Sequence, residues 1–155
     1  MEYPLIRKAK PEEWQKVVDI YKRENLNKDV DLVERETKKE FPEIGTNRII
    51  WFAEVNGLII GVIQLVFLQG DLANGKDSAM IHHLRVSKNF EGKGIGSQLI
   101  KTVEEEAVRR DIKILNLEVD RNNRRARMIY EHLGYNYSKD GTDPSEIILT
   151  KYLFH

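Results

Sequence analysis

The chain has 155 residues, 41% hydrophobic and 32% charged, values typical of one soluble globular domain with a substantial core. Lys plus Arg and Asp plus Glu both number 25, so a formal net charge of zero gives no general attraction to nucleic acid or anionic membranes. The absence of cysteine excludes disulfides, thiolate nucleophiles and zinc–thiolate sites. Because the first ten residues lack the apolar core of a signal peptide and no apolar run is as long as a membrane span, we expect a cytoplasmic protein.

The first forty residues predict a short strand and two helices. The strand covers Leu5–Lys8, and a helix follows from Pro11, which suits a first helical turn. The apolar residues of this helix recur at helical spacing: Trp14, Val17, Val18 and Tyr21. A second, polar helix is predicted over Asp29–Glu40, with Val30, Val33 and Thr37 on its inner face.

A β-hairpin is predicted next. Arg48–Val55 and Leu58–Leu68 are rich in Ile, Val and Phe, and Asn56-Gly57 between them is a strong hairpin signal. A polar loop over Gly70–Lys76 then leads to a strand over Ser78–Val86.

A glycine-rich segment, Glu91-Gly92-Lys93-Gly94-Ile95-Gly96, joins that strand to a predicted helix over Gly94–Arg110. Glycine has no Cβ, so such a loop can direct several backbone N–H groups at one anion. The helix adds its own unpaired N–H groups and the positive end of its dipole. The pattern therefore predicts a phosphate or pyrophosphate site, and a turn that only reverses the chain is the alternative. The spacing matches neither the Gly-x-Gly-x-x-Gly of dinucleotide-binding folds nor a Walker A loop.

The last third of the chain completes a mixed sheet. The helix has an apolar stripe of Ile95, Leu99, Val103 and Ala107. The next strand, Ile112–Asp120, alternates Leu115, Leu117 and Val119 with Asn116 and Glu118, and the βαβ order predicts that it lies parallel to Ser78–Val86. A short helix over Asn123–Leu133 has a predicted inner face of Ala126, Ile129, Tyr130 and Leu133, with Gly134 as its C-terminal cap. Tyr135–Ser138 and Ile147–Tyr152 are predicted to form a closing antiparallel pair.

The segment Asn123-Arg-Arg-Ala126-Arg-Met-Ile-Tyr130-Glu-His-Leu-Gly134-Tyr135 resembles the Asn-x-x-Ala-x-x-x-Tyr-x-x-x-Gly-Phe/Tyr signature of the GNAT superfamily of acyl-CoA-dependent N-acetyltransferases. Leu84-Arg85-Val86 and the glycine-rich segment are similar to the pyrophosphate-binding motif of that family, and the two motifs stand in the expected order. The resemblance covers Ala79 to Tyr135. It implies a single GNAT domain over residues 1–155. Its α/β fold would have a mixed, mostly antiparallel sheet of six to seven strands, a central parallel pair splayed to hold CoA, and helices on both faces.

The resemblance also implies how the cofactor, acetyl-CoA, is held, without a metal. Backbone groups of Leu84 and Val86 would pair with the pantetheine arm. Backbone N–H groups would hold the pyrophosphate, from Gly92, Lys93, Gly94, Ile95, Gly96 and Ser97. Asn123 would contact the cofactor through its side-chain amide, and its position also suits a helix N-cap. The family often has Gln or Arg where this chain has Glu91, and we expect this carboxylate to turn outward.

Two catalytic residues are expected from the resemblance. Tyr130 stands where the family places its general acid, near the cofactor sulfur, although packing in the core would also explain it. His82, on the strand before the loop, is the candidate general base, since histidine titrates near neutral pH. A hydrogen-bonded core histidine is the alternative, and Glu118, Asp120 or a water chain are the other candidates for the base.

The function expected from these features is the transfer of an acetyl group from acetyl-CoA to a primary amine, by direct attack in a ternary complex. The acceptor is a small molecule or a peptide amine, and no nucleic acid or membrane partner is expected. A CoA-binding protein of the same fold with a sensing or regulatory role is the alternative. Dimers are frequent in the family, which makes a homodimer an expectation. A basic cluster beside the proposed cofactor site could contact the 3′-phosphate of CoA, attract an acidic partner or be solvated: Arg121, Arg124, Arg125 and Arg127. The aromatic residues considered for the acceptor side are Trp14, Tyr21, Phe41, Trp51 and Tyr137.

Overall fold

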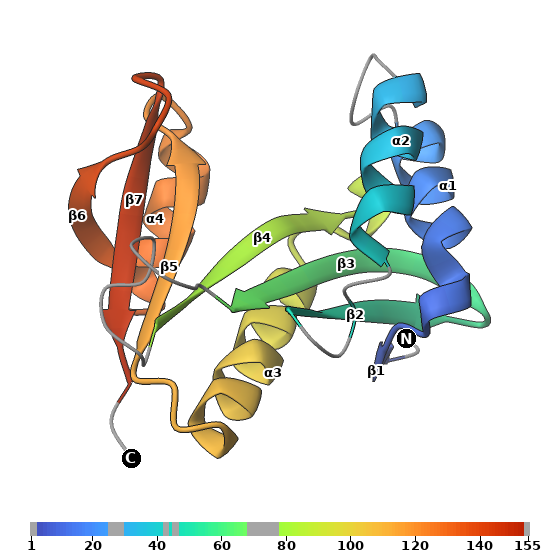
Figure 1. Cartoon of the computed structure of the whole chain (residues 1–155), viewed down its shortest axis with the longest axis horizontal. Helices are drawn as coiled ribbons and strands as arrows, with labels where there is room; N and C mark the ends of the chain where they lie inside the picture. The colour runs from blue at the N-terminus through green and yellow to red at the C-terminus, as the bar shows by residue number, and fades with distance from the viewer. Residues whose placement is uncertain (1–2, 25–29, 42–43, 45–46, 68–77, 154–155) are drawn as a thin grey trace. The chain divides into compact units, whose positions relative to one another are not determined.

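The computed structural model describes residues 3–24, 30–41, 44, 47–67 and 78–153, and its elements follow the predicted order (Figure 1). The chain divides into two compact units, each built from separate stretches. The first unit contains residues 1–64 and 83–100, and the second contains residues 65–82 and 101–155. That all 155 residues form one domain stays a prediction.

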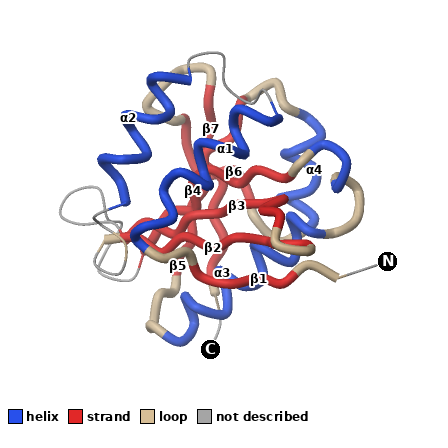
Figure 2. Tube along the Cα trace, turned by 90° about the vertical axis from the view of Figure 1, so that its right-hand side faces the viewer, coloured by secondary structure: helices blue, strands red, loops and turns tan. Residues whose placement is uncertain are grey.

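The strands of the first unit begin with β1 (Leu5–Lys8), which lies antiparallel to β2 (Arg48–Val55) (Figure 2). A two-residue turn joins β2 to β3 (Leu58–Phe67), and its residues Asn56 and Gly57 have φ angles of 51° and 80°. Positive φ at both positions is what a type I′ hairpin turn requires. The hairpin predicted from the sequence is confirmed.

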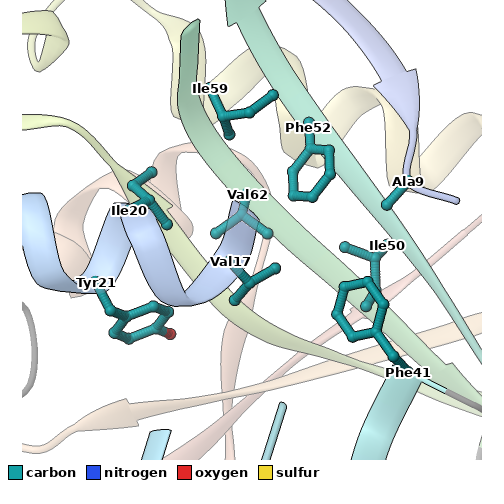
Figure 3. Close-up of a cluster of buried hydrophobic side chains, with 9 residues drawn as sticks. All are labelled: Ala9, Val17, Ile20, Tyr21, Phe41, Ile50, Phe52, Ile59 and Val62. Atoms are coloured by element: carbon teal, nitrogen blue, oxygen red, sulfur yellow. The ribbon is translucent and has the colours of Figure 1, made fainter. Parts of the chain in front are cut away.

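Helices cover both faces of these strands. A short 3₁₀ turn (Pro11–Glu13) leads into α1 (Trp14–Glu24), which lies beside α2 (Val30–Glu40) over β2 and β3 (Figure 1). Figure 3 shows the core between α1 and the strands, built from Ala9, Val17, Ile20, Tyr21, Phe41, Ile50, Phe52, Ile59 and Val62. Thr37 of α2 is buried as predicted, whereas Asp29 and the side chains of Val30 and Val33 lie outside the described residues, as does the loop Gly70–Lys76.

The opposite face of β2 and β3 is covered by the start of α3 (Ile95–Arg109). A Cβ added at Gly61 would lie 3.2 Å from Leu99 Cδ1 and 3.3 Å from the Cβ of Ala53, so the helix contacts the strand where it has no side chain. All four members of the predicted stripe of α3 are buried: Ile95, Leu99, Val103 and Ala107.

The second unit contains the first residues of β4 (Ser78–Val86) together with β5 (Ile114–Asp120), β6 (Asn136–Asp140), β7 (Glu146–Tyr152) and α4 (Arg124–His132). β4 pairs in parallel with β5, which pairs antiparallel with β7, and β7 pairs antiparallel with β6. Over the described residues the hydrogen-bonded order is β1-β2-β3-β4-β5-β7-β6, seven strands in all. The predicted mixed sheet, with a parallel central pair, is confirmed.

Two side chains differ from their predicted positions. Asn116, placed on the polar side of β5, is only 3% exposed; its Oδ1 accepts a hydrogen bond of 2.7 Å from Thr150 Oγ1. This partner on β7 makes the burial of a polar side chain tolerable. Ile129, placed on the inner face of α4, is 45% exposed. Successive helical residues are rotated by about 100°, so Ile129 points well away from Tyr130, which is half-buried like Ala126 and Leu133.

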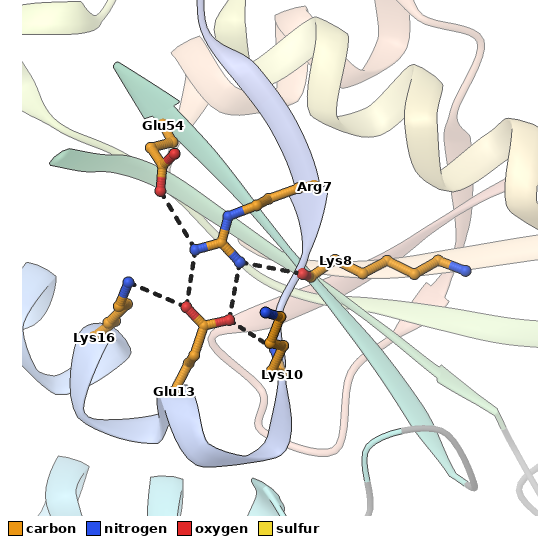
Figure 4. Close-up of polar contacts among 6 residues, drawn as sticks. All are labelled: Arg7, Lys8, Lys10, Glu13, Lys16 and Glu54. Atoms are coloured by element: carbon orange, nitrogen blue, oxygen red, sulfur yellow. Dashed lines mark hydrogen bonds and ion pairs between the residues drawn. The ribbon is translucent and has the colours of Figure 1, made fainter. Parts of the chain in front are cut away.

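A network of charged side chains fastens the start of the first helical segment to β1 and β2 (Figure 4). Arg7 donates two hydrogen bonds of 2.8 Å to the two carboxylate oxygens of Glu13, and a third of 3.3 Å to Glu54. The carboxylate of Glu13 also accepts from the N–H of Lys10 at 2.8 Å and lies 3.1 Å from Lys16 Nζ. Chiefly because Arg7 donates to it, the pKa of Glu13 falls to about 2.

We expect Glu13→Gln to lower the free energy of unfolding at pH 7 by about 1–2 kcal/mol, because hydrogen bonds to a charged group are lost. Folding lowers the pKa of Glu13 from 4.5 to about 2, so the stabilisation is complete above about pH 4.5 and is lost as the pH falls toward 2. Urea unfolding at several pH values should therefore show the difference between wild type and variant shrinking over that range. Its exposed neighbour gives the control Glu12→Gln, for which no such difference is expected. A difference that stays constant with pH would contradict this role of Glu13.

Candidate functional site

The glycine-rich loop lies between β4 and α3 in the first unit. After β4 the chain forms a 3₁₀ turn over Lys88–Phe90 and then passes through Gly92 and Gly94, whose φ angles are 74° and 81°. Residues other than glycine rarely adopt this backbone conformation. No other atom lies within 4 Å of the place where a Cβ would stand at either glycine. The loop therefore needs glycine for its backbone and leaves open space beside it.

Unpaired backbone N–H groups gather at this loop. The first hydrogen bond of α3 runs from the N–H of Gln98 to the carbonyl of Gly94, at 3.0 Å. Within the part of the chain that the structure describes, no group accepts a hydrogen bond from the backbone N–H groups of residues 92–97. The first N–H groups of a helix have no partner inside the helix and, with its dipole, favour an anion. Residues 92–97 thus offer several N–H donors at the start of α3, and their binding of a pyrophosphate stays a prediction.

The end of β4 presents backbone groups beside the loop. Ser87 donates its N–H to the carbonyl of Ile60 on β3 at 2.7 Å. Because backbone groups alternate in direction along a strand, those of Val86 and Leu84 point away from β3. The carbonyl of Leu84 accepts one hydrogen bond of 2.8 Å, from Arg85 Nη1. The parallel ladder pairs Ser78–Ile81 with β5, and β4 continues beyond it to Val86.

Two charged side chains flank the glycines. Lys93 Nζ lies 5.4 Å from the centroid of the Phe90 ring, a cation–π contact, and both residues line a small pocket that extends to Ile95 and Gln98. Glu91 is exposed, and its N–H donates to the carbonyl of Lys88 at 3.3 Å.

The second unit holds the residues of the downstream motif. Asn123 is the N-cap of α4, since its Oδ1 accepts a hydrogen bond of 3.1 Å from the N–H of Ala126. This confirms the cap, whereas contact with a cofactor stays a prediction. Tyr130 is half-buried on the same helix, and its carbonyl accepts from the N–H of Tyr135 at 3.0 Å. Gly134, with a φ of 99°, ends the helix as predicted.

Tyr135 anchors the end of α4, a role that the sequence did not reveal. Its side chain is fully buried, and its hydroxyl donates a hydrogen bond of 2.7 Å to Glu104 Oε2. Lys151 Nζ lies 3.0 Å from the same oxygen, so the carboxylate has a cationic partner as well. Burial, reinforced by Glu104, raises the pKa of Tyr135 and keeps it a hydrogen-bond donor. The Gly-Tyr that ends the motif was the available signal.

The candidates for a general base differ in their surroundings. His82 is half-buried on β4 and has interactions of its own, and Glu118 and Asp120 are exposed on β5. Asp120 Oδ1 accepts a hydrogen bond of 2.8 Å from the N–H of Asn122, so this carboxylate has a structural role in the turn before α4. The pKa of Glu146 is raised by burial and by the nearby carboxylate of Glu118.

The family of the chain follows from its sequence. Residues 14–135 match the model of the acetyltransferase (GNAT) family. The chain belongs to this family. An uncharacterized N-acetyltransferase of Archaeoglobus fulgidus is 31% identical over 97 residues, which are 63% of this chain and 66% of that protein. The uncharacterized N-acetyltransferase YhfO of Bacillus subtilis is 32% identical over 87 residues, 56% of this chain and 58% of that protein. The matched region thus spans less than two thirds of either relative.

Solved structures show the same fold. A PaiA N-acetyltransferase of Thermoplasma acidophilum, crystallised with coenzyme A, has a TM-score of 0.80 at 18% identity, and the match covers 98% of this chain and all of that one (100%). The ribosomal-protein-S18-alanine N-acetyltransferase of Escherichia coli has a TM-score of 0.76 at 19% identity, over 98% of this chain and 95% of that one. The predicted GNAT fold is confirmed.

The basic cluster of this GNAT protein is partly engaged within the protein. Arg121 Nη2 lies 2.8 Å from Asp140 Oδ1, and Arg127 Nη1 donates to the carbonyl of Arg121 at 3.1 Å. Arg124 and Arg125 are exposed. These last two are therefore the first candidates for an external phosphate or an acidic partner.

The aromatic residues considered for the acceptor side of the GNAT site are mostly core residues. Tyr21, Phe41 and Trp51 are buried, and Trp14 packs half-buried against the same core as Tyr21. Tyr137, on β6, is 56% exposed. Its hydroxyl donates a hydrogen bond of 3.0 Å to Asp140 Oδ1, and its ring is the most exposed of the five.

Proposed function

We propose that this GNAT protein transfers an acetyl group from acetyl-CoA to a primary amine, by direct attack of the amine in a ternary complex. The observation that carries the proposal is the set of backbone N–H groups from Gly92 to Ser97 that the described part of the chain leaves without an acceptor. The neighbour crystallised with coenzyme A supports the choice of cofactor.

The first unit supplies the groups that would hold the cofactor. The N–H groups of Gly92, Lys93, Gly94, Ile95, Gly96 and Ser97 would bind the pyrophosphate, and the missing Cβ atoms of the loop glycines allow its oxygens to approach the backbone. The backbone groups of Leu84 and Val86, which point away from β3, would pair with the pantetheine arm. A carbonyl has two lone pairs, so the hydrogen bond from Arg85 to Leu84 leaves one available. In the second unit, Asn123 would add its amide, and Arg124 and Arg125 are the candidates for the 3′-phosphate.

Acetyl-CoA supplies the acetyl group as an activated thioester. The amine must be neutral to attack, and we assign His82 to accept its proton, because an imidazole titrates close to neutral pH. As the new C–N bond forms and the C–S bond breaks, the Tyr130 hydroxyl gives its proton to the departing sulfur. The second proton that the nitrogen loses as the amide forms returns to the Tyr130 phenolate, directly or through water, and solvent takes the proton from His82, so the protonation states are restored. Glu118 or a water chain is the alternative base, whereas Asp120 is already bound in a turn.

The acceptor is proposed only as a class. A small amine is the first choice, and a peptide amine is the second, favoured by the fold shared with an enzyme named for a ribosomal-protein alanine. A panel of amines and peptides, assayed by release of free CoA, separates the two. Retained CoA binding without turnover on the whole panel would favour the sensing role instead. A cytoplasmic location and a homodimer stay predictions.

We expect Gly94→Ala to weaken CoA binding at least about tenfold, because a methyl group would stand where a phosphate must approach and the backbone would be strained. The matched control is Gly57→Ala in the β2–β3 turn: its φ is 80° and its Cβ position is equally open. Both variants should lose about 1–2 kcal/mol of stability, and only Gly94→Ala should lose affinity. Calorimetric titration with CoA and thermal unfolding measure the two effects. Absence of CoA binding by the wild type would end the proposal.

Tyr130→Phe should lower kcat by about a hundredfold, the lower end of the range for a lost general acid. The Kd of CoA should change less than about twofold, because the ring remains and the phosphate donors are elsewhere. Exposed Tyr152, at the end of β7, provides the control Tyr152→Phe, which should leave kcat unchanged. An unchanged kcat in Tyr130→Phe would remove the assignment.

His82→Gln should lower kcat/KM and abolish the acidic limb of its pH profile, because the titrating base is gone. The control is His132→Gln, at an exposed position at the end of α4, which should leave the profile unchanged. The measurement is kcat/KM from about pH 5 to pH 9 with the best amine of the panel. A profile that keeps its acidic limb would transfer the role to Glu118 or to a water chain.

A further inference from the structure

The end of α1 is fastened to the segment that leads into the phosphate-binding loop. Glu24, the last residue of α1, accepts a hydrogen bond of 2.7 Å on its Oε1 from the N–H of Lys88, 64 residues later in the chain. Its neighbour Arg23 donates through Nη2 to Ser87 Oγ at 3.0 Å and to the carbonyl of Ile59. Two adjacent side chains of one helix thus hold two adjacent residues beyond β4.

The held segment lacks a cap of its own. Lys88 begins the 3₁₀ turn Lys88–Phe90, and Ser87 stands at its N-cap without a side-chain cap bond. The N–H at the start of such a turn has no partner within it, so the carboxylate of Glu24 acts as the cap from another helix. The turn itself contains only two further backbone bonds, from Phe90 to Ser87 at 2.8 Å and from Glu91 to Lys88 at 3.3 Å.

The carboxylate is well placed to keep this role. The side chain of Glu24 is 14% exposed, and its Oε2 lies 3.1 Å from Arg23 Nε. The N–H of Lys88, followed by Arg23, lowers the pKa of Glu24, so the group is ionised at neutral pH. A hydrogen bond between an ionised acceptor and a backbone N–H is stronger than one between neutral groups.

We propose that Glu24 is a positioning residue for cofactor binding: by capping the Lys88–Phe90 turn from α1, it sets the place of the N–H groups at Gly92 to Ser97. This rests on the proposed function, because it concerns the same pyrophosphate site. Glu24 contacts the N–H of Lys88, so on this proposal it acts through the backbone that leads into the loop. A shift of α1 would then move the loop, because Glu24 is bonded to Lys88 and the Lys88–Phe90 turn leads directly into the glycines.

The test compares Glu24→Ala with Glu24→Gln, which keeps the length of the side chain and one acceptor oxygen. The control is Asp19→Ala, which removes an exposed carboxylate from the same helix. In the protein without cofactor, hydrogen–deuterium exchange of the hydrogen-bonded N–H groups of Lys88, Phe90 and Glu91, resolved by NMR, should become about tenfold faster in Glu24→Ala, less so in Glu24→Gln, and stay unchanged in Asp19→Ala. The Kd of CoA should rise about five- to tenfold in Glu24→Ala and less in Glu24→Gln, while kcat at saturation changes less than about twofold.

The outcomes separate this inference from the proposed function. If the wild type binds no CoA, the proposed function fails, and the exchange data alone decide whether Glu24 holds the loop. Wild-type exchange and wild-type affinity in Glu24→Ala would overturn the inference. Faster exchange with unchanged affinity would overturn the positioning role as well. If Glu24→Ala does not fold, the same comparisons are made with Glu24→Gln, whose intermediate effect the inference requires.

Discussion

The first backbone N–H groups of a helix find no hydrogen-bond acceptor inside that helix, and at α3 the residues of the preceding loop extend this row of unpaired donors. Six successive residues, 92–97, present N–H groups for which the described chain offers no acceptor. Two of them adopt positive φ, which only glycine does without strain. The donors are therefore fixed by backbone conformation, and an anion is the ligand that such an arrangement stabilises best.

The approach of α3 to the sheet depends on a further glycine. Gly61 lies within a strand of bulky apolar residues, where glycine weakens a strand unless close packing requires it. Here a Cβ would lie 3.2 Å from Leu99 Cδ1, a tighter contact than side chains usually make, so glycine lets the helix approach the strand closely. In the first turn of α3, a Cβ added at Gly96 would lie 4.0 Å from side-chain atoms of both Leu84 and Val86. The start of the helix therefore lies close to the end of β4. Core packing thus places the phosphate donors beside the strand proposed to bind pantetheine.

What the sequence predicted well was determined by near neighbours along the chain. The Asn56-Gly57 turn, the Asn123 cap and the Gly134 helix end each depend on a few adjacent residues, and all three are confirmed. The contacts that were missed join distant residues. Asn116 meets Thr150, Tyr135 meets Glu104, and Glu24 meets Lys88, at separations of 34, 31 and 64 residues. No periodicity reveals such pairs, because strand register and helix packing decide them. The roles of Tyr130 and His82 depend on atoms of a cofactor and an acceptor, so they stay predictions.

Glu91 is exposed, and a phosphate site built from backbone N–H groups would be compatible with a carboxylate at this position. At that position the family often has Gln or Arg, and a carboxylate would repel a pyrophosphate if its side chain were a ligand. The main-chain donors of the loop are the same whatever side chain stands at 91, since they come from residues 92–97. The turn that precedes them accepts help from elsewhere in the chain, because the N–H of Lys88 donates to Glu24. On the proposal made above, the carboxylate that matters for the loop is therefore Glu24, distant in sequence, and not Glu91 beside the glycines.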